Sequence, residues 1–368
     1  MTWSWRIGRI AGISVYIHFT FLLLLGWIVL ARYSLEGDIT AALQEMGFVV
    51  IVFGIIVLHE LGHALAARRY GIQTRDITLY PIGGVARLER MPEDPKQELV
   101  VALAGPAVNV VLAAALFGWM WVSPEVYEIH PGLLLGGQLL PRLFVINVML
   151  VLFNMIPAFP MDGGRVLRAL LALRMDYLRA TQIAASIGQG IALLFGFIGL
   201  FANPFLIFVA LFVWIGAAQE ASMVQIRWAL GGIPVSRAMI RDFRTLKPND
   251  SLGVAVEHIL AGFQQDFPVV EDGKVVGVLT RPDLITALSK QGEEGIVGEV
   301  MQRDFQTAEP AEMLDSVFAR LQNCECRSLP VVRNGQLVGL ITLDNVGEFV
   351  MIQSALRSAN PNVPEDFI

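Results

Sequence analysis

The chain has 368 residues, of which 55% are hydrophobic and only 16% are charged. A soluble globular protein carries about 25% charged residues, so this composition excludes a wholly soluble chain and places a large part of it in lipid. The formal net charge of −6 and the lack of a basic cluster argue against nucleic-acid binding. Because the apolar residues are concentrated before about residue 225, the sequence predicts a membrane domain followed by a soluble domain.

The apolar residues of the first domain form six segments that are candidates for membrane-spanning helices. They cover residues 15–31, 48–67, 99–122, 143–160, 183–201 and 205–218, and a short turn at Ala202-Asn203-Pro204 separates the last two. The predicted fold class is therefore a polytopic α-helical membrane domain with about six transmembrane helices, followed by an α/β domain. No cleavage-site pattern follows the first segment, so we expect an anchor and not a removed signal peptide.

Basic residues predict the orientation of these segments. If the N-terminus is cytosolic, the cytosolic side receives all but two of the arginine and lysine residues between Arg6 and Arg179. The opposite side receives only Arg32 and Arg142. Basic residues are enriched in cytoplasmic loops, so we expect a multi-pass protein of the cell membrane with both termini and the soluble domain in the cytosol.

The second apolar segment contains the sequence His59-Glu60-Leu61-Gly62-His63. Two histidines four residues apart lie on one face of a helix, so both rings can reach one metal ion. The glutamate between them can act as a general base on water at that metal. A pair of polar residues lining a helix interface is the alternative, but ionisable groups at membrane depth are costly and usually functional.

A carboxylate follows the fourth apolar segment, in the stretch from Asn154 to Arg165. Pro157, Pro160 and a glycine pair break the helix where Asp162 arrives. The second and fourth segments cross in the same direction, so Asp162 can meet the two histidines at similar depth. Two histidines and a carboxylate with one open position form a catalytic zinc site, with one zinc ion per subunit, whereas a simple turn aspartate is the alternative.

Two other features near these residues suit substrate binding. Asn154 lies two helical turns before Asp162 and could donate a hydrogen bond to a scissile carbonyl or its oxyanion, or else form a helix–helix contact. The segment 80–86 carries Gly83 and Gly84 and predicts a re-entrant strand whose edge could pair with an unwound substrate, with a plain loop as the alternative. The small residues of segment 104–109 predict close helix packing.

These segments, together with Gly105-Pro106, resemble the site-2 protease family of intramembrane zinc metalloproteases, in the same order across the whole membrane domain. The resemblance implies that His59, His63 and Asp162 bind zinc, that Glu60 is the catalytic base and that Asn154 contacts the substrate or the oxyanion. It also implies single-span membrane proteins as substrates, cleaved in or near their transmembrane segments with release of a cytosolic fragment.

The soluble half is an internal repeat. Residues after Gly231 match themselves at a constant offset of 62 without gaps, so that Met239 recurs as Met301 and the motif 268–270 recurs as 330–332. A match of this length predicts two copies of one structural unit. Each unit reads as a helix (252–261; 314–321), a strand (267–271; 329–333), a glycine turn, a second strand and a helix.

The repeat resembles a tandem pair of CBS modules, whose paired units commonly form a cleft for adenosine ligands. The family motif Gly-x-x-Thr-x-x-Asp is met by Gly277, Thr280 and Asp283, whose carboxylate would bind ribose hydroxyls. The resemblance implies an adenine nucleotide such as ATP as regulator, and a homodimer that forms through the modules. A degenerate pair used only for dimerisation is the alternative.

The second unit departs from this motif. It has Thr342 but carries Asn345 at the aspartate position, with Asp344 one place early. Thr342 and Asp344 are the candidate nucleotide-binding residues there, and Asn345 distinguishes this second site from the first.

The expected organisation is a metalloprotease domain (1–220), a linker (221–234), two modules (235–290 and 291–355) and a tail (356–368). Cys324 and Cys326 are too close for an unstrained disulfide, which indicates a reducing compartment. The alternative functions are a CBS-gated membrane transporter or channel for metal ions and a catalytically silent scaffold. Glu60 favours hydrolysis, because transport needs metal ligands but no base.

Overall fold

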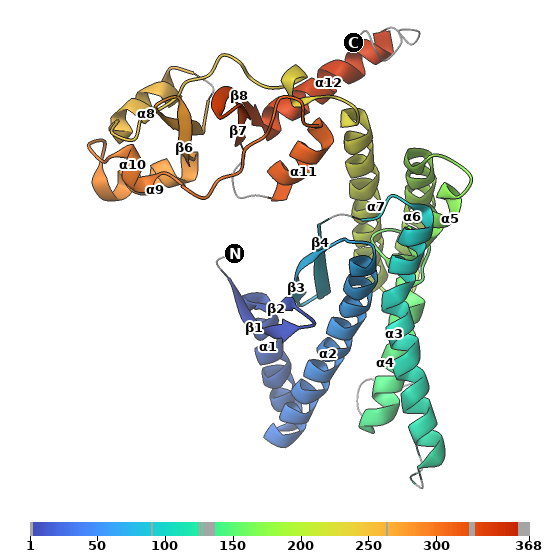
Figure 1. Ribbon diagram of the computed structural model, residues 1–368. Coiled ribbons are helices and arrows are strands. Elements are labelled where there is room, and N and C mark those ends of the chain that lie inside the picture. The colour runs from blue at the N-terminus through green and yellow to red at the C-terminus, as the bar shows by residue number, and fades with distance from the viewer. Residues whose placement is uncertain are drawn as a thin grey trace. The chain divides into compact units, whose positions relative to one another are not determined.

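The computed structural model describes residues 3–89, 91–123, 125, 127, 137–262, 264–323 and 328–359 (Figure 1). The chain forms two compact units, an N-terminal unit (Met1–Val224) and a C-terminal unit (Gln225–Ile368). Cys324 and Cys326 lie outside the described residues, so the prediction made for them concerns a part of the chain that is not described.

In the described part of the chain, four helices are long and apolar enough to cross a membrane. They are α2 (Ile39–Arg69), α3 (Pro95–Val122), α6 (Tyr177–Phe201) and α7 (Phe205–Leu230). Two shorter apolar helices, α1 (Phe19–Glu36) and α4 (Leu139–Asn154), correspond to the other two predicted segments. The polytopic helical fold is confirmed, and α7 continues well past the end predicted for it at residue 218.

The first and fourth predicted segments were placed wrongly at one end each. Segment 15–31 begins as a strand, because β1 (Ser4–Ile10) and β2 (Ile13–His18) form an antiparallel hairpin before α1. His18 ends this hairpin and caps α1 by accepting a hydrogen bond from the Thr20 backbone N–H at 3.3 Å. The fourth segment stops at the end of α4 and not at residue 160, because prolines follow in the turn.

The N-terminal unit also contains a four-stranded sheet with the order β1-β2-β3-β4. β3 (Thr74–Tyr80) pairs in parallel with β2 and antiparallel with β4 (Gly83–Leu88). The predicted strand around residues 80–86 is therefore present, and it is an edge strand of this sheet. β3 and β4 lie beside α2 (Figure 1), where Ile77 packs against Leu61 and Ala64.

α3 is the central helix of the site, because it contacts α2, α4 and α5 (Asp162–Ala172). Its crossing with α2 is close at Gly62, where an added Cβ atom would lie 2.7 Å from the carbonyl oxygen of Ala104. Glycine at this position of the His59–His63 motif thus allows the backbones of α2 and α3 to approach each other.

α5 is a short helix that follows the turn after α4 and packs against α3 and α6. Phe159 is fully buried in this turn, against Ala184, Ala185 and Ala217. This packing anchors the turn, so that Asp162 is held at the first residue of α5. A carboxylate in the first turn of a helix also interacts favourably with the helix dipole.

The C-terminal unit contains the two predicted copies of one motif. The first copy comprises α8 (Leu252–Leu260), β5 (Phe267–Glu271), β6 (Lys274–Leu279) and α9 (Arg281–Gln291), followed by α10 (Val297–Val300). The second comprises α11 (Leu314–Asn323), β7 (Ser328–Arg333), β8 (Gln336–Thr342) and α12 (Leu343–Ala359). Each strand pair is an antiparallel hairpin, and β6 and β8 lie next to each other.

The segment that precedes each copy pairs with a strand of the other copy. Ile240, ahead of the first copy, pairs with Leu340 of β8, and Gln302, ahead of the second, pairs with Val278 of β6. Both pairs are related by the offset of 62 residues. The repeat therefore forms one intertwined pair of modules.

Candidate metal centre

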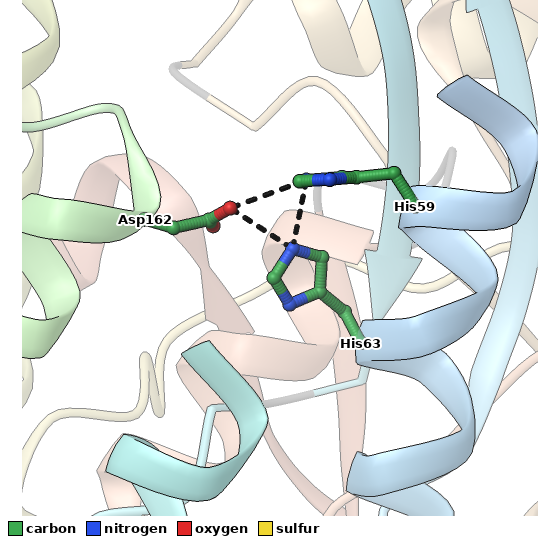
Figure 2. A group of neighbouring side chains, drawn as sticks. All are labelled: His59, His63 and Asp162. Atoms are coloured by element: carbon green, nitrogen blue, oxygen red, sulfur yellow. Dashed lines mark hydrogen bonds and ion pairs between the residues drawn. The ribbon is translucent and has the colours of Figure 1, made fainter. Parts of the chain in front are cut away.

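Three side chains from two distant parts of the chain meet in the N-terminal unit. His59 and His63 project from α2 toward Asp162 at the start of α5 (Figure 2). The Nε2 atoms of the histidines are 3.1 Å apart, and Asp162 Oδ2 lies 3.2 Å from His59 Nε2 and 3.1 Å from His63 Nε2. All three residues are buried. The structure thus brings together the three residues that the sequence analysis selected as metal ligands.

α3 supplies a hydrogen-bond acceptor to the far side of each imidazole ring. His63 Nδ1 donates to the backbone carbonyl of Val101 at 2.7 Å, and His59 Nδ1 donates to Asn109 Oδ1 at 2.6 Å. A neutral histidine that donates through Nδ1 carries a lone pair on Nε2. Both Nε2 lone pairs therefore face each other and the carboxylate.

This arrangement fits a bound zinc ion. With both histidines neutral, two nitrogen lone pairs and a carboxylate oxygen have no proton to share, so their close approach is repulsive unless a cation lies between them. Ligand atoms about 2.0–2.1 Å from a tetrahedral zinc ion lie about 3.3 Å from one another, close to the separations found here. Three protein ligands would leave one coordination position open, as in catalytic zinc sites.

Gly105 of α3 forms a wall of the site beside the Nε2 atoms of the two histidines. Its backbone lies against both Nε2 atoms and leaves no room for a Cβ atom. The sequence analysis assigned segment 104–109 to helix packing alone. The structure shows in addition that Gly105 and Asn109 of this segment contact the histidines directly.

Glu60 lies between the two histidines in sequence and faces β4. Its Oε2 atom accepts a hydrogen bond from the backbone N–H of Ala86 at 3.3 Å. A Cβ atom added to Gly84 would come within 3.1 Å of Glu60 Cγ and 2.9 Å of Ile56 Cγ2. Glycine at position 84 therefore lets the edge strand lie directly against the helix that carries the candidate base.

Asn154 is the last residue of α4, and its Nδ2 donates to the carbonyl of Leu150 at 2.9 Å. This bond uses one of the two amide hydrogens and leaves the other for a further acceptor. The structure places Asn154 at the end of the helix that leads to Asp162, outside the cluster of three candidate metal-ligand atoms.

An ion cluster that the sequence analysis missed joins the helices of the site. Arg168 of α5 donates to Glu98 of α3 through Nε at 2.8 Å and Nη2 at 2.5 Å, and to Glu220 of α7 through Nη1 at 2.6 Å. Burial lowers the pKa of Arg168, but the neighbouring acidic groups, Glu98 foremost, together outweigh this effect and hold that pKa above its usual value. Sequence spacing gives no signal for these contacts, because the partners are 70 and 52 residues away.

In the C-terminal unit, Thr280 and Asp283 lie together at the start of α9. Thr280 Oγ1 donates to Asp283 Oδ2 at 2.6 Å, and Gln302 Nε2 donates to the same oxygen at 2.8 Å. Thr280 also caps the helix by accepting from the Asp283 N–H. The other carboxylate oxygen, Oδ1, takes no part in these bonds.

The corresponding position of the second module is occupied by Asn345. Its backbone N–H donates to Thr342 Oγ1 at 3.1 Å, as the N–H of Asp283 does to Thr280. Asp344 is exposed in the first turn of α12. The structure therefore aligns Asn345, and not Asp344, with the aspartate of the first module.

Comparison with known proteins gives the family of both units. Residues 47–130 and 137–196 match peptidase family M50, and residues 235–290 and 297–351 match the CBS domain. A zinc metalloprotease of Methanocaldococcus jannaschii is 33% identical over 347 residues, which cover 94% of this chain and 96% of that protein.

Solved structures are similar to each unit. The site-2 protease from Methanocaldococcus jannaschii is 39% identical, with 60% of this chain and 95% of that chain covered and a TM-score of 0.44. A CBS domain pair in complex with 5-methylthioadenosine and S-adenosyl-L-methionine is 22% identical, with 33% of this chain and 97% of that chain covered and a TM-score of 0.29. The family models and the 33% identical relative show that the chain belongs to peptidase family M50, the site-2 proteases, and is a multi-pass membrane zinc metalloprotease with a C-terminal pair of CBS domains.

Proposed function

We propose that His59, His63 and Asp162 hold one zinc ion per subunit and that Glu60 is the catalytic base for peptide hydrolysis. The observation that carries this proposal is the meeting of two Nε2 lone pairs and a carboxylate oxygen at 3.1–3.2 Å. When bound, zinc supplies a Lewis acid that polarises the scissile carbonyl and makes water more acidic. Glu60 takes a proton from the attacking water and passes it to the leaving amide nitrogen. A metal-ion transporter would need no residue in this role.

Asn154 is the proposed partner of the oxygen that becomes negatively charged during the attack. One of its amide hydrogens is held by Leu150, which fixes the direction of the side chain. The second hydrogen can then donate to the scissile carbonyl oxygen. A preorganised donor of this kind is worth about 3–4 kcal/mol in other hydrolases.

β4 is the proposed docking strand for the substrate. An extended substrate segment can add to an edge strand through backbone hydrogen bonds. Gly83 leaves space for its side chains, because an added Cβ atom there meets no described heavy atom within 4 Å, and Gly84 brings the strand against the helix that carries Glu60. The contact between Ala86 and Glu60 supports this role, because a segment paired with β4 lies next to the base. The substrates are single-span membrane proteins whose helices unwind in the site, and cleavage releases a cytosolic fragment.

The CBS pair is proposed to bind an adenine nucleotide at Thr280 and Asp283 and to regulate proteolysis. Asp283 Oδ1 can accept hydrogen bonds from ribose hydroxyls while Oδ2 keeps its bonds to Thr280 and Gln302. The second module, with Thr342 and the exposed Asp344, offers a weaker site. Coupling between the nucleotide and protease sites should be on the order of 1–3 kcal/mol, and the CBS pair would also support a homodimer.

The substrate class can be tested by co-expression of the full chain with single-span proteins, such as membrane-tethered regulators of transcription. Two matched versions of each candidate, with either leucine or glycine residues at the centre of the span, separate helix unwinding from recognition. We expect a product cut within or next to the span, more of it from the glycine version, and none with Glu60→Gln. Cleavage confined to soluble loops would contradict the proposed substrate class.

A further inference from the structure

A chain of hydrogen bonds leads from His59 through two buried asparagines to the backbone of α4. His59 Nδ1 is bonded to Asn109 Oδ1 at 2.6 Å, and Asn109 Nδ2 donates to Asn147 Oδ1 at 2.9 Å. Asn147 Nδ2 in turn donates to the carbonyl of Leu143 at 2.8 Å. Both asparagines have no exposed surface. The chain is therefore enclosed by α2, α3 and α4.

The carbonyl at the end of this chain fixes the direction of every bond in it. A backbone carbonyl only accepts, so Asn147 must present its NH₂ group to Leu143 and its oxygen to Asn109. Asn109 must then present its NH₂ group to Asn147 and its oxygen to His59. As a result, His59 carries its proton on Nδ1 and keeps a lone pair on Nε2.

The opposite orientation of Asn109 would disable His59 as a metal ligand. If the amide turned over, its NH₂ group would face Nδ1, and the ring proton would move to Nε2, which points at the metal position. His63 has no such alternative, because its partner is the backbone carbonyl of Val101. The two ligands therefore differ: His63 is oriented by the main chain, whereas His59 depends on an amide that can turn over.

We infer that Asn147 is a positioning residue for the zinc site: by orienting the Asn109 amide, it keeps His59 in the tautomer that presents Nε2 to the metal. This inference rests on the proposed zinc ligands. A purely structural contact between α3 and α4 would use the same hydrogen bond. The two roles differ in one respect, because only the positioning role acts through the orientation of Asn109.

The test is the zinc affinity of the purified full chain in detergent, measured by competition with a chromophoric chelator. Asn147→Leu should weaken zinc binding by roughly tenfold or more, as is usual when the partner of a metal-bound histidine is lost. In the Asn109→Asp background the acceptor is a carboxylate, which accepts through either oxygen. Adding Asn147→Leu there should change zinc affinity less than about twofold, because no orientation remains to be fixed.

The inference would be overturned if Asn147→Leu lowered zinc affinity equally in the wild-type and Asn109→Asp backgrounds, or in neither of them. Thr181→Val is the matched control, because Thr181 is also fully buried in a helix of the N-terminal unit and its hydroxyl donates to the carbonyl of Tyr177 in its own helix. Thr181→Val should leave zinc affinity unchanged. If it lowers zinc affinity as much as Asn147→Leu does, removing any buried polar side chain weakens the site, and Asn147 has no special role.

A second variant decides the question if the Asn109→Asp chain does not fold. Asn109→Leu removes the acceptor itself and should weaken zinc binding at least as much as Asn147→Leu does. If Asn109→Leu weakens zinc binding less than Asn147→Leu does, Asn147 does not act through Asn109 and the inference fails. If the wild-type chain itself binds no zinc, the assignment of the zinc ligands fails together with the inference. If wild type and Asn147→Leu bind zinc equally well, only the role of Asn147 is overturned.

Discussion

Gly105 of α3 lies so close to His63 of α2 that a Cβ atom at position 105 would stand 2.1 Å from His63 Nε2. The same atom would stand 2.7 Å from His59 Nε2. Both distances are far below van der Waals contact, and the atoms they reach are the ones that would bind zinc. The spacing of α2 and α3 is therefore part of the metal site.

Gly105→Ala should abolish zinc binding, because one methyl group displaces both imidazole rings from Asp162. Zinc content of the purified chain, measured by atomic emission, checks this. Gly118→Ala is the control in the same helix, where an added Cβ meets no described heavy atom within 4 Å. Zinc loss in both variants, or in neither, would contradict the proposed role of Gly105.

The ion cluster around Arg168 should make a large contribution to stability. Arg168 and Glu98 have no exposed surface, so removing the charge of Arg168 leaves Glu98 buried without its ion-pair partner. Arg168→Gln should lower the free energy of unfolding by about 3–5 kcal/mol, and adding Glu98→Gln should recover part of that loss. Thermal unfolding in detergent measures both effects.

A partly exposed ion pair provides the comparison. Arg320 and Glu312 of the C-terminal unit form a contact of 2.6 Å, and their side chains are about one-third exposed. Arg320→Gln should cost less than about 1 kcal/mol. If it destabilises the chain as much as Arg168→Gln does, burial of the Arg168 cluster is not the source of its effect.

The orientation of the membrane domain can be tested with single cysteines in a background that lacks Cys324 and Cys326. Ile82 is 86% exposed at the tip of the β3–β4 hairpin, and Leu35 is 80% exposed near the end of α1. The positive-inside asymmetry places position 82 in the cytosol and position 35 outside. A polar maleimide should label Ile82→Cys only in inside-out vesicles and Leu35→Cys only in right-side-out ones. The reverse pattern would invert the topology.

The nucleotide site should depend on Asp283 and not on Asp344. Asp283→Ala removes the carboxylate that is held beside Thr280, and it should weaken binding of an adenine nucleotide by about tenfold or more without changing zinc content. Asp344→Ala should have little effect on nucleotide binding, because that side chain is exposed and does not align with Asp283. Calorimetry with adenosine mono-, di- and triphosphate on the full chain measures both. If none of the three binds, the CBS pair keeps only its proposed role in dimerisation.

Local patterns allowed much of the fold and site to be predicted. The spacing of His59 and His63 has meaning only on a helix, and the long apolar segment around them made a helix the clear expectation. The repeat was equally clear, because an ungapped match at an offset of 62 residues allows only one alignment of the two copies. Strand Phe267–Glu271 was predicted with its observed bounds.

Contacts between distant residues were not predictable in the same way. Asn109 was seen only as part of a small-residue segment, and Asn147 lies 38 residues further on, inside an apolar segment where nothing marks it. The hairpin of β1 and β2 was missed because β2 is mostly apolar and leads directly into α1, so that its residues were counted with the first apolar segment. These features depend on which helices become neighbours, and that is decided by packing over the whole unit.

The most direct test of the central claim compares wild type and Glu60→Gln for zinc content and for cleavage of a membrane substrate. Glu60 is not one of the three residues whose atoms converge on the metal position, so its isosteric amide should retain one zinc ion per subunit. The amide cannot take a proton from water, so cleavage should fall to the level measured without the enzyme. Full zinc content with no cleavage is the predicted result, and normal cleavage by Glu60→Gln would contradict the assignment of the catalytic base.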